Sequence, residues 1–300
     1  MTVTKDWGRG AAVGEVAAAL DAVERQLDGL GTGAIPRTIH QTYFSATLPP
    51  ALSGNVDALR ALNPGWSFSF YDDAAVERFI AEEYGKAILA RYLRISPKYG
   101  AARADLFRYL LIFRSGGVYL DIKSSADQPF DEVLRSDDRF IISQWDNGIN
   151  GIHPGGGLFH PELAAIPHGE FQQWHIIAAP GHPFLRAVIE RVLHAIDTYN
   201  PYRVGVGLNV LRVTGPIPYT LAIAPLLACH PHRRVRDERA LGLRYTILGG
   251  EVHRRHLRGH YSRRRTPIVG ADRGWIANAP LLGFIVARSL VRRAIKRLKR

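Results

Sequence analysis

The chain has 300 residues, of which 46% are hydrophobic and 22% charged, so a wholly disordered chain is excluded and one large α/β domain or two smaller ones are expected. Its single cysteine, Cys229, excludes a disulfide framework and any multi-cysteine metal site. The net charge of +12 is uneven: residues 233–300 hold 19 basic and 4 acidic residues, and the rest holds 20 basic and 23 acidic. This asymmetry points to a polyanionic surface, which is nucleic acid, an anionic membrane or an acidic polymer.

No membrane-spanning helix is expected, because the longest apolar stretch near the end, Ile276–Ala287, has only about 12 residues. The first ten residues lack the basic segment and apolar core of a secretory signal. We therefore expect a cytoplasmic protein, peripheral at the inner membrane face if the basic end binds lipid.

Strands and helices alternate along the chain. In chain order, the patterns predict a helix over 13–30, a strand over 36–41, a helix ending at 62, a strand over 66–71, a helix from Asp72 or Asp73 toward Glu83, a helix over 99–114, strands over 118–120 and 139–144, a helix over 183–199 and a buried apolar segment over 219–227. This alternation favours a parallel or mixed sheet covered by helices. The simplest division is an N-terminal helix (1–33), one domain (34–270) and a basic amphipathic tail (271–300).

The candidate chemistry lies around the strand at 118–120. Asp121 ends this strand, and ligands of open α/β sheets bind at the carboxyl ends of strands, although a lone aspartate is as often a turn residue. Asp105 and Arg108 lie three residues apart and so share one face of the preceding helix, as a structural ion pair also would. Together with the Gly116-Gly117 turn, these residues fall within seventeen positions, which favours one ligand site.

The segment DLFRYLLIFRSGGVYLDIKSS, together with IPRTIHQTYFS, NPGWSFSFYDD and VTGPIPYT, resembles the glycosyltransferase family that carries the DXD sugar-binding motif. That family includes fungal initiating α-1,6-mannosyltransferases and bacterial capsular polysaccharide synthesis proteins. The resemblance spans roughly residues 35–261. It implies a GT-A fold, which is a Rossmann-like mixed sheet flanked by helices, a UDP- or GDP-sugar donor, and retention of the anomeric configuration.

Particular roles follow from the resemblance. It implies that Asp105 and Arg108 contact the sugar and diphosphate of the donor, and that Asp121 contacts the ribose and a divalent metal, Mn²⁺ or Mg²⁺. The residues that it implies for donor binding are His40, Gln41, Tyr119, Thr214, Gly215 and His260.

One position departs from the family pattern. Where the motif has its second acid, this sequence has Lys123, and a protonated lysine cannot ligate a metal ion. Either Asp121 binds the metal with help from elsewhere, or the Lys123 ammonium partly replaces the metal at the leaving diphosphate. A degenerate, inactive domain is the third reading.

Two weaker patterns remain. Residues 287–300 place apolar and basic side chains on opposite faces of a helix, which favours binding to an anionic membrane surface; a helix packed on the domain is the alternative. Nucleic acid is disfavoured because the basic region lacks interleaved aromatic residues. Five histidines, at positions 153, 160, 168, 175 and 182, lack zinc-site spacing, and we expect most of them in loops or at the surface.

The expected function is that of a retaining glycosyltransferase, which moves a sugar from a nucleotide-sugar to a cell-surface or capsular glycan or to a lipid-linked acceptor. The alternative is a module without catalytic activity that binds a sugar nucleotide or an anionic surface.

Overall fold

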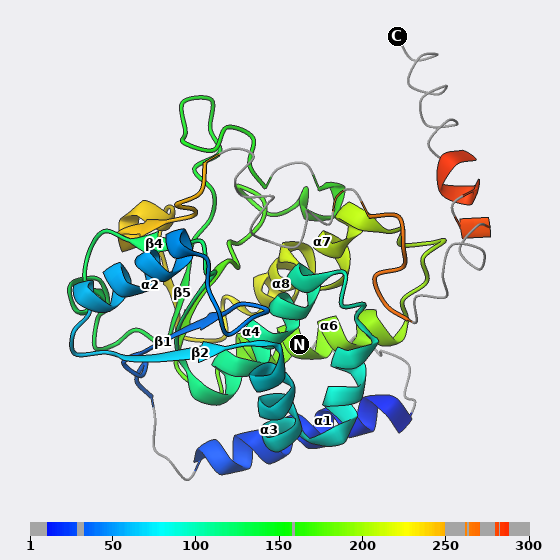
Figure 1. Ribbon diagram of the computed structural model, residues 1–300, viewed down its shortest axis with the longest axis horizontal. Coiled ribbons are helices and arrows are strands. Elements are labelled where there is room, and N and C mark those ends of the chain that lie inside the picture. Colours follow the sequence, from blue (N-terminus) through cyan, green and yellow to red (C-terminus); the bar gives the residue numbers. More distant parts are fainter. Residues whose placement is uncertain are drawn as a thin grey trace.

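A mixed six-stranded sheet forms the centre of the molecule (Figure 1). The computed structural model describes residues 11–28, 33–157, 160–249, 262, 264–270, 280–281 and 283–287. The strands follow the order β2-β1-β3-β6-β5-β7, and their bounds are β1 Thr38–Thr42, β2 Ser67–Tyr71, β3 Gly117–Leu120, β5 Phe140–Ile142, β6 His175–Ala178 and β7 Arg233–Arg234. A second, two-stranded sheet pairs β4 (Ser125–Ala126) with β8 (Leu243–Arg244). The expected mixed sheet with flanking helices is therefore confirmed.

Strand directions bring distant loops to one edge of the sheet. β1 pairs in parallel with both β2 and β3, whereas β6 is antiparallel to β3 and to β5. Leu120, the last residue of β3, pairs with His175, the first residue of β6. The amide of Asp121 then donates to the carbonyl of Trp174 at 2.9 Å. The residues that follow β1 and β3 and those that precede β6 consequently meet at the same edge.

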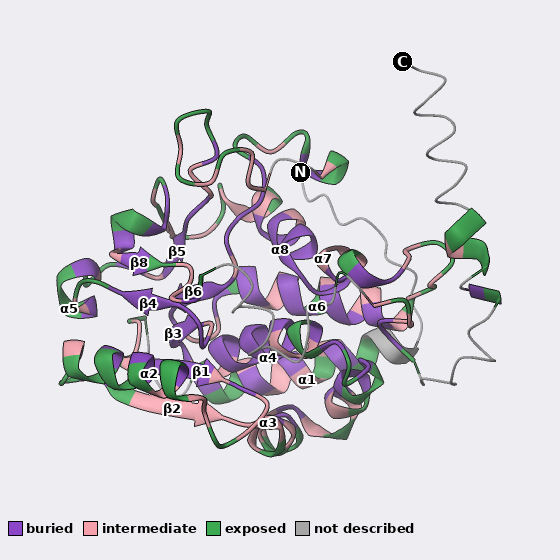
Figure 2. Ribbon diagram, turned by 45° about the horizontal axis from the view of Figure 1, so that its top comes forward, coloured by how far each residue is buried: buried purple, intermediate pink, exposed green. Residues whose placement is uncertain are grey.

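Helices cover both faces of the sheet (Figure 2). Their bounds are α1 Ala11–Asp28, α2 Pro50–Leu62, α3 Asp73–Arg94, α4 Gly100–Ser115, α5 Phe130–Val133, α6 Pro183–Asp197, α7 Val210–Val213 and α8 Pro216–Ile223. Side chains alternate along the strands: Tyr119 of β3 packs in the core formed with α1, α3, α4, α6 and α8, while Val118 and Leu120 pack in the core formed with α2 and α5. The largest helical layer is therefore the one that contains α4.

The N-terminal helix α1 is part of this layer. It packs against α3 and α6 (Figure 1), and its apolar face, which includes Leu20 and Val23, joins the core formed with α4. The guanidinium of Arg186 on α6 holds α1 from outside through a 2.7 Å ion pair with Asp21.

Three local expectations differ from the structure. Asp72 caps α3, because its carboxylate accepts from the amide of Ala75 at 2.8 Å, but the helix continues past Glu83 to Arg94 across a kink at Gly85. Strand β6 was not expected. Its first residue, His175, is buried because β6 pairs on both sides, whereas His153, His160 and His168 lie in loops, as expected for most of the five histidines. The apolar segment over 219–227 is buried only as far as Ile223, and Pro225 is exposed.

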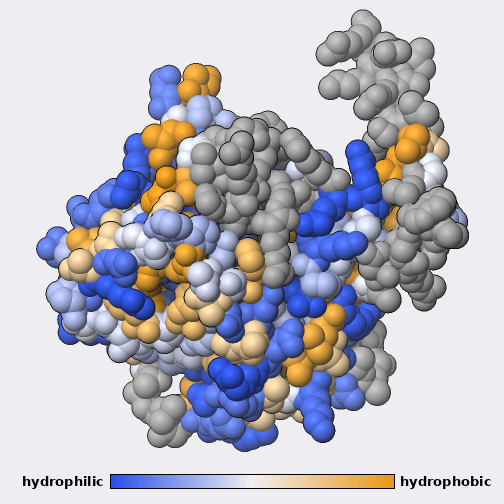
Figure 3. Space-filling model, in the orientation of Figure 1, coloured by the Kyte–Doolittle hydropathy of each residue, from blue (hydrophilic) through white to orange (hydrophobic). Residues whose placement is uncertain are grey.

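Apolar side chains are exposed in few places on the described surface. The clearest is the loop after β5, which rises above the body of the molecule in Figures 1 and 3; there Ile149 is 95% exposed and Ile152 46%. Within the described ranges, no helix combines the length and the apolar character needed to cross a bilayer. The expected basic helix over 287–300 lies outside the described residues except for Ala287, and so does His260.

Candidate active site

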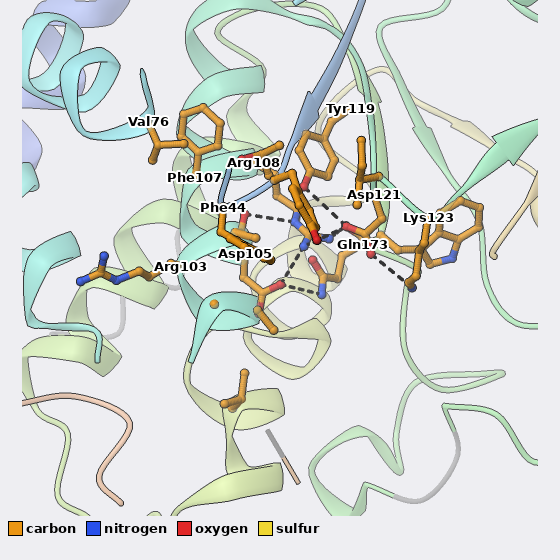
Figure 4. A pocket seen from close by; sticks show the side chains of 18 of the residues that line it. Phe44, Val76, Arg103, Asp105, Phe107, Arg108, Tyr119, Asp121, Lys123 and Gln173 are labelled. Carbon is orange, nitrogen blue, oxygen red and sulfur yellow. Dashed lines mark hydrogen bonds and ion pairs between the residues drawn. The ribbon is translucent and has the colours of Figure 1, made fainter. Parts of the chain in front are cut away.

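A cavity of about 370 Å³ opens at the sheet edge where β1 and β3 end. Its walls come from the last residue of β1 and the two residues after it (42–44), the residues after β3 (121–123), the first half of α4 and the residues just before β6 (173–174). Figure 4 shows how side chains from these elements point toward one another. The cavity thus lies at the carboxyl ends of parallel strands, where the sequence predicts a ligand site.

Helix α4 carries the first two charged groups of this cavity. The helix is buried on nearly every side between the sheet and α6. Gly116 caps its C-terminal end with a positive φ of 63°, and a Cβ at this position would lie only 2.6 Å from Pro180 Cδ, so no side chain fits there. Asp105 and Arg108 lie on the turn of α4 that faces the sheet edge. Burial of the helix therefore fixes both side chains beneath the cavity.

Arg108 is the centre of the charge network (Figure 4). Its Nη2 lies 3.1 Å from Oδ1 of Asp105 and 3.1 Å from Oδ1 of Asp121, so one guanidinium joins α4 to the end of β3. Its Nη1 donates to the carbonyl of Gln173 at 2.8 Å, and its Cζ lies 4.9 Å from the ring centroid of Tyr119. Burial by itself lowers the pKa of Arg108, but the carboxylates of Asp121 and Asp105 reverse this effect and raise the pKa overall. Arg108 is a permanent, fixed cation.

Asp105 pairs with Arg108 on α4 and fixes the position of its guanidinium. Both of its carboxylate oxygens have donors: Thr214 Oγ1 lies 2.9 Å from Oδ2, and Gln173 Nε2 lies 3.2 Å from Oδ1. Burial raises the pKa of Asp105, and the charge of Arg108 and these two hydrogen bonds offset the rise only in part. Since its polar atoms are all engaged inside the protein, Asp105 positions Arg108.

Asp121 and Lys123 form the opposite wall. Lys123 Nζ lies 3.4 Å from Oδ2 of Asp121 and 3.7 Å from the ring centroid of Tyr245. The Asp121 side chain is 21% exposed, whereas that of Lys123 is 6% exposed. A hydrogen bond fixes the loop that carries both residues, because Asn55 Nδ2 donates to the carbonyl of Ser124 at 2.8 Å.

This donor set does not fit a divalent metal ion. Each oxygen of Asp121 already faces a fixed cation, Arg108 at Oδ1 and Lys123 at Oδ2. A divalent ion about 4 Å from the Lys123 ammonium would meet roughly 8 kcal/mol of repulsion at an effective dielectric constant of about 20, before the attraction of Asp121 is counted. The described part of the chain also holds no group of three or more His, Cys, Asp or Glu residues arranged for a metal.

The structure brings most of the sequence-derived candidates together. Five of them line the cavity: Asp105, Arg108, Tyr119, Asp121 and Lys123. Thr214 lies directly behind Asp105, and Gly215 precedes Pro216, which is itself in the lining.

His40 and Gln41 do not line the cavity; the next three residues of the chain do. Both side chains are buried in the sheet, where His40 pairs in register with Tyr119. Burial lowers the pKa of His40 to about 4, so its ring is neutral at pH 7.

Several lining residues had no sequence signal. Gln173 bridges Asp105 and Arg108, and it stands alone in the chain without a motif. Trp174 also lines the cavity, and its indole Nε1–H is buried with no acceptor in the part of the chain that the structure describes. Trp145 also lines the cavity, and its Nε1 donates to Oε1 of Glu170 at 2.7 Å. Burial raises the pKa of Glu170.

Part of the chain is similar to a known family. Residues 49–140 match the family described as "Glycosyltransferase sugar-binding region containing DXD motif", which confirms the resemblance found in the sequence. The matched part of the chain contains α4, β3, Asp121 and Lys123. Gln173, Thr214 and Tyr245 lie beyond the matched residues.

Particular relatives are fungal mannosyltransferases. The chain is 26% identical over 198 residues to inositol phosphoceramide mannosyltransferase 3 of Schizosaccharomyces pombe, which covers 66% of this chain and 47% of that protein. It is 31% identical over 134 residues to the initiation-specific alpha-1,6-mannosyltransferase of Candida albicans, covering 43% of this chain and 34% of that protein. The chain spans about half the length of the three curated inositol phosphoceramide mannosyltransferases that it matches. Among solved structures, PaToxG Glycosyltransferase aligns with a TM-score of 0.42 at 15% identity, covering 81% of this chain and 92% of that one.

Proposed function

We propose that this protein is a glycosyltransferase that moves a sugar from a UDP- or GDP-sugar to an acceptor hydroxyl. The observation that carries the proposal is the shared guanidinium of Arg108, which lies 3.1 Å from both Asp105 and Asp121 beside Lys123 in a single cavity. Two fixed cations suit a diphosphate, and the half-buried carboxylate of Asp121 suits a sugar or ribose hydroxyl. The matched family region covers the same four residues.

The transfer needs little covalent chemistry from the protein. The bond between the anomeric carbon and the diphosphate oxygen breaks, and its electron pair remains on the diphosphate. The acceptor oxygen forms a new bond to the anomeric carbon, and its hydroxyl proton passes to an oxygen of the leaving diphosphate. In this proposal the protein orients the two substrates and stabilises the charge that develops on the leaving group. Retention of configuration, as the family resemblance implies, requires attack from the face that the diphosphate leaves.

Each cavity residue has a distinct proposed role. Arg108 and Lys123 contact the diphosphate, Tyr119 packs beside the nucleotide, and Asp121 accepts hydrogen bonds from the ribose or the sugar. Asp105 and Thr214 position Arg108 from behind. His40, Gln41, Gly215 and His260 remain proposed donor-side residues on the family resemblance alone. The proposed catalytic unit is residues 34–270.

We propose a lipid-linked acceptor ahead of a capsular glycan. The relatives named above include mannosyltransferases of inositol phosphoceramide, whose acceptor carries a lipid. In this chain the loop after β5 begins near Trp145, a cavity residue, and presents Ile149 and Ile152 to solvent. An apolar loop close to the cavity supports an acceptor that has an apolar portion.

A donor-hydrolysis panel tests the proposal against the alternative of an inactive sugar-nucleotide-binding module. Glycosyltransferases commonly hydrolyse their donor slowly without an acceptor, so we expect one UDP- or GDP-sugar to release its nucleoside diphosphate above background. Asp121→Ala should abolish this release. Asp127→Ala, which removes an exposed aspartate paired with Arg244, is the matched control and should not. Background release from every donor would favour the inactive module.

A further inference from the structure

The sequence replaces the second acid of the motif with a lysine, and the structure shows where that lysine goes. The Lys123 side chain is buried, and its ammonium is held between Oδ2 of Asp121 at 3.4 Å and the face of Tyr245 at 3.7 Å. The residue is therefore not a solvated surface lysine that merely occupies the motif position. It presents its charge at the cavity wall.

The backbone around Lys123 keeps this charge in place. The carbonyl of Lys123 accepts from the amide of Ile247 at 2.8 Å, and Ser124 Oγ donates to the carbonyl of Tyr245 at 2.8 Å. Tyr245, whose ring contacts the ammonium, is thus hydrogen-bonded to the same loop. A cation fixed in this way needs no reorganisation when charge develops on a bound group.

The charges of the site balance without an ion. The carboxylates of Asp105 and Asp121 are matched by the cations Arg108 and Lys123, and each oxygen of Asp121 faces one of these cations. A divalent ion bound to Asp121 would lie beside one of these cations and be repelled by it. A diphosphate, in contrast, brings negative charge that the two cations can share.

We propose that Lys123, together with Arg108, takes the place of the divalent ion. The protein therefore binds the diphosphate of its donor without a metal ion, and the lysine at position 123 is what makes this binding independent of metal. The inference rests on the proposed function, because it concerns the same diphosphate. It goes further by assigning the role of the metal ion to the side chains of Lys123 and Arg108.

Nucleoside diphosphate binding tests the inference separately from catalysis. UDP and GDP are titrated calorimetrically into the full chain, first in EDTA and then with Mn²⁺. The inference predicts that the better of the two binds with the same Kd, within about twofold, in both conditions. Lys123→Met should weaken binding about tenfold or more in EDTA, the loss typical of a hydrogen bond to a charged group. Lys86→Met on the exposed face of α3 removes the same charge and should leave binding unchanged.

A charge reversal makes the test sharper. Lys123→Asp puts a second carboxylate two residues after Asp121, so this variant should bind diphosphate poorly in EDTA and recover about tenfold or more with Mn²⁺. Titration of Mn²⁺ alone should show a site in Lys123→Asp and none in the wild type.

The outcomes separate the two proposals. Wild-type binding that requires Mn²⁺ overturns the metal-independence and leaves the glycosyltransferase proposal standing. Absence of UDP and GDP binding in both conditions overturns both. Should Lys123→Asp fail to fold, the wild-type comparison of EDTA with Mn²⁺ still decides the matter.

Discussion

Replacing Arg108 with methionine should expose how strongly the site depends on one buried cation. The substitution keeps the length and apolar stem of the side chain but leaves Asp105 buried without its cation. Breaking a buried ion pair by removing one partner costs about 3–5 kcal/mol. We therefore expect the unfolding free energy of Arg108→Met at pH 7 to fall by about that amount, measured by urea denaturation with tryptophan fluorescence.

The unfolding free energy lost in Arg108→Met should depend on pH. Burial already raises the pKa of Asp105, and loss of Arg108 removes the strongest opposing charge, so the folded variant takes up a proton that the unfolded chain releases. A carboxyl whose pKa is raised in the folded state gains stability as pH falls. The difference between wild type and variant should shrink from pH 8 to pH 5. Adding Asp105→Asn should recover most of the loss, because no buried carboxylate then remains unpaired. A loss of unfolding free energy below about 1 kcal/mol, unchanged by pH and by the Asp105→Asn substitution, would refute the reasoning.

Three further predictions concern groups around the site. Thr214→Val removes the donor to Asp105 and should lower kcat for donor hydrolysis about tenfold, with a smaller change in KM; an unchanged kcat would show that Thr214 is only structural. Burial lowers the pKa of His175 to about 3, so the folded state binds fewer protons than the unfolded chain below pH 6.5. Stability should therefore fall between pH 6.5 and pH 5, and His175→Gln should reduce that fall by about 2 kcal/mol in denaturation curves. Ile149→Ser with Ile152→Ser should reduce co-sedimentation with anionic vesicles and leave donor hydrolysis intact; equal sedimentation would argue against the loop as a lipid contact.

Sequence patterns predicted the part of the site that is local in the chain. Asp105 and Arg108 share a face because they are three residues apart, and α4, the turn at Gly116 and β3 follow one another without a break. The position of Asp121 at the strand end follows from the same run of residues. Short spacing and regular periodicity were sufficient to predict this part of the site.

The rest of the site depends on pairings that no local pattern encodes. Gln173 and Trp174 reach the cavity only because the four-residue strand β6 runs antiparallel to β3, and a strand of that length gives little periodic signal. Tyr245 arrives through contacts with the loop that carries Ser124. His40 was placed at a strand end, but β1 continues for two more residues, so its side chain stays inside the sheet.

The most direct test of the account is a crystal structure of the protein grown with UDP or GDP in EDTA. The account predicts the nucleotide in the cavity at the ends of β1 and β3, with diphosphate oxygens within about 3.2 Å of Arg108 or Lys123. A nucleotide bound elsewhere on the protein, or one whose diphosphate touches neither cation, would contradict it.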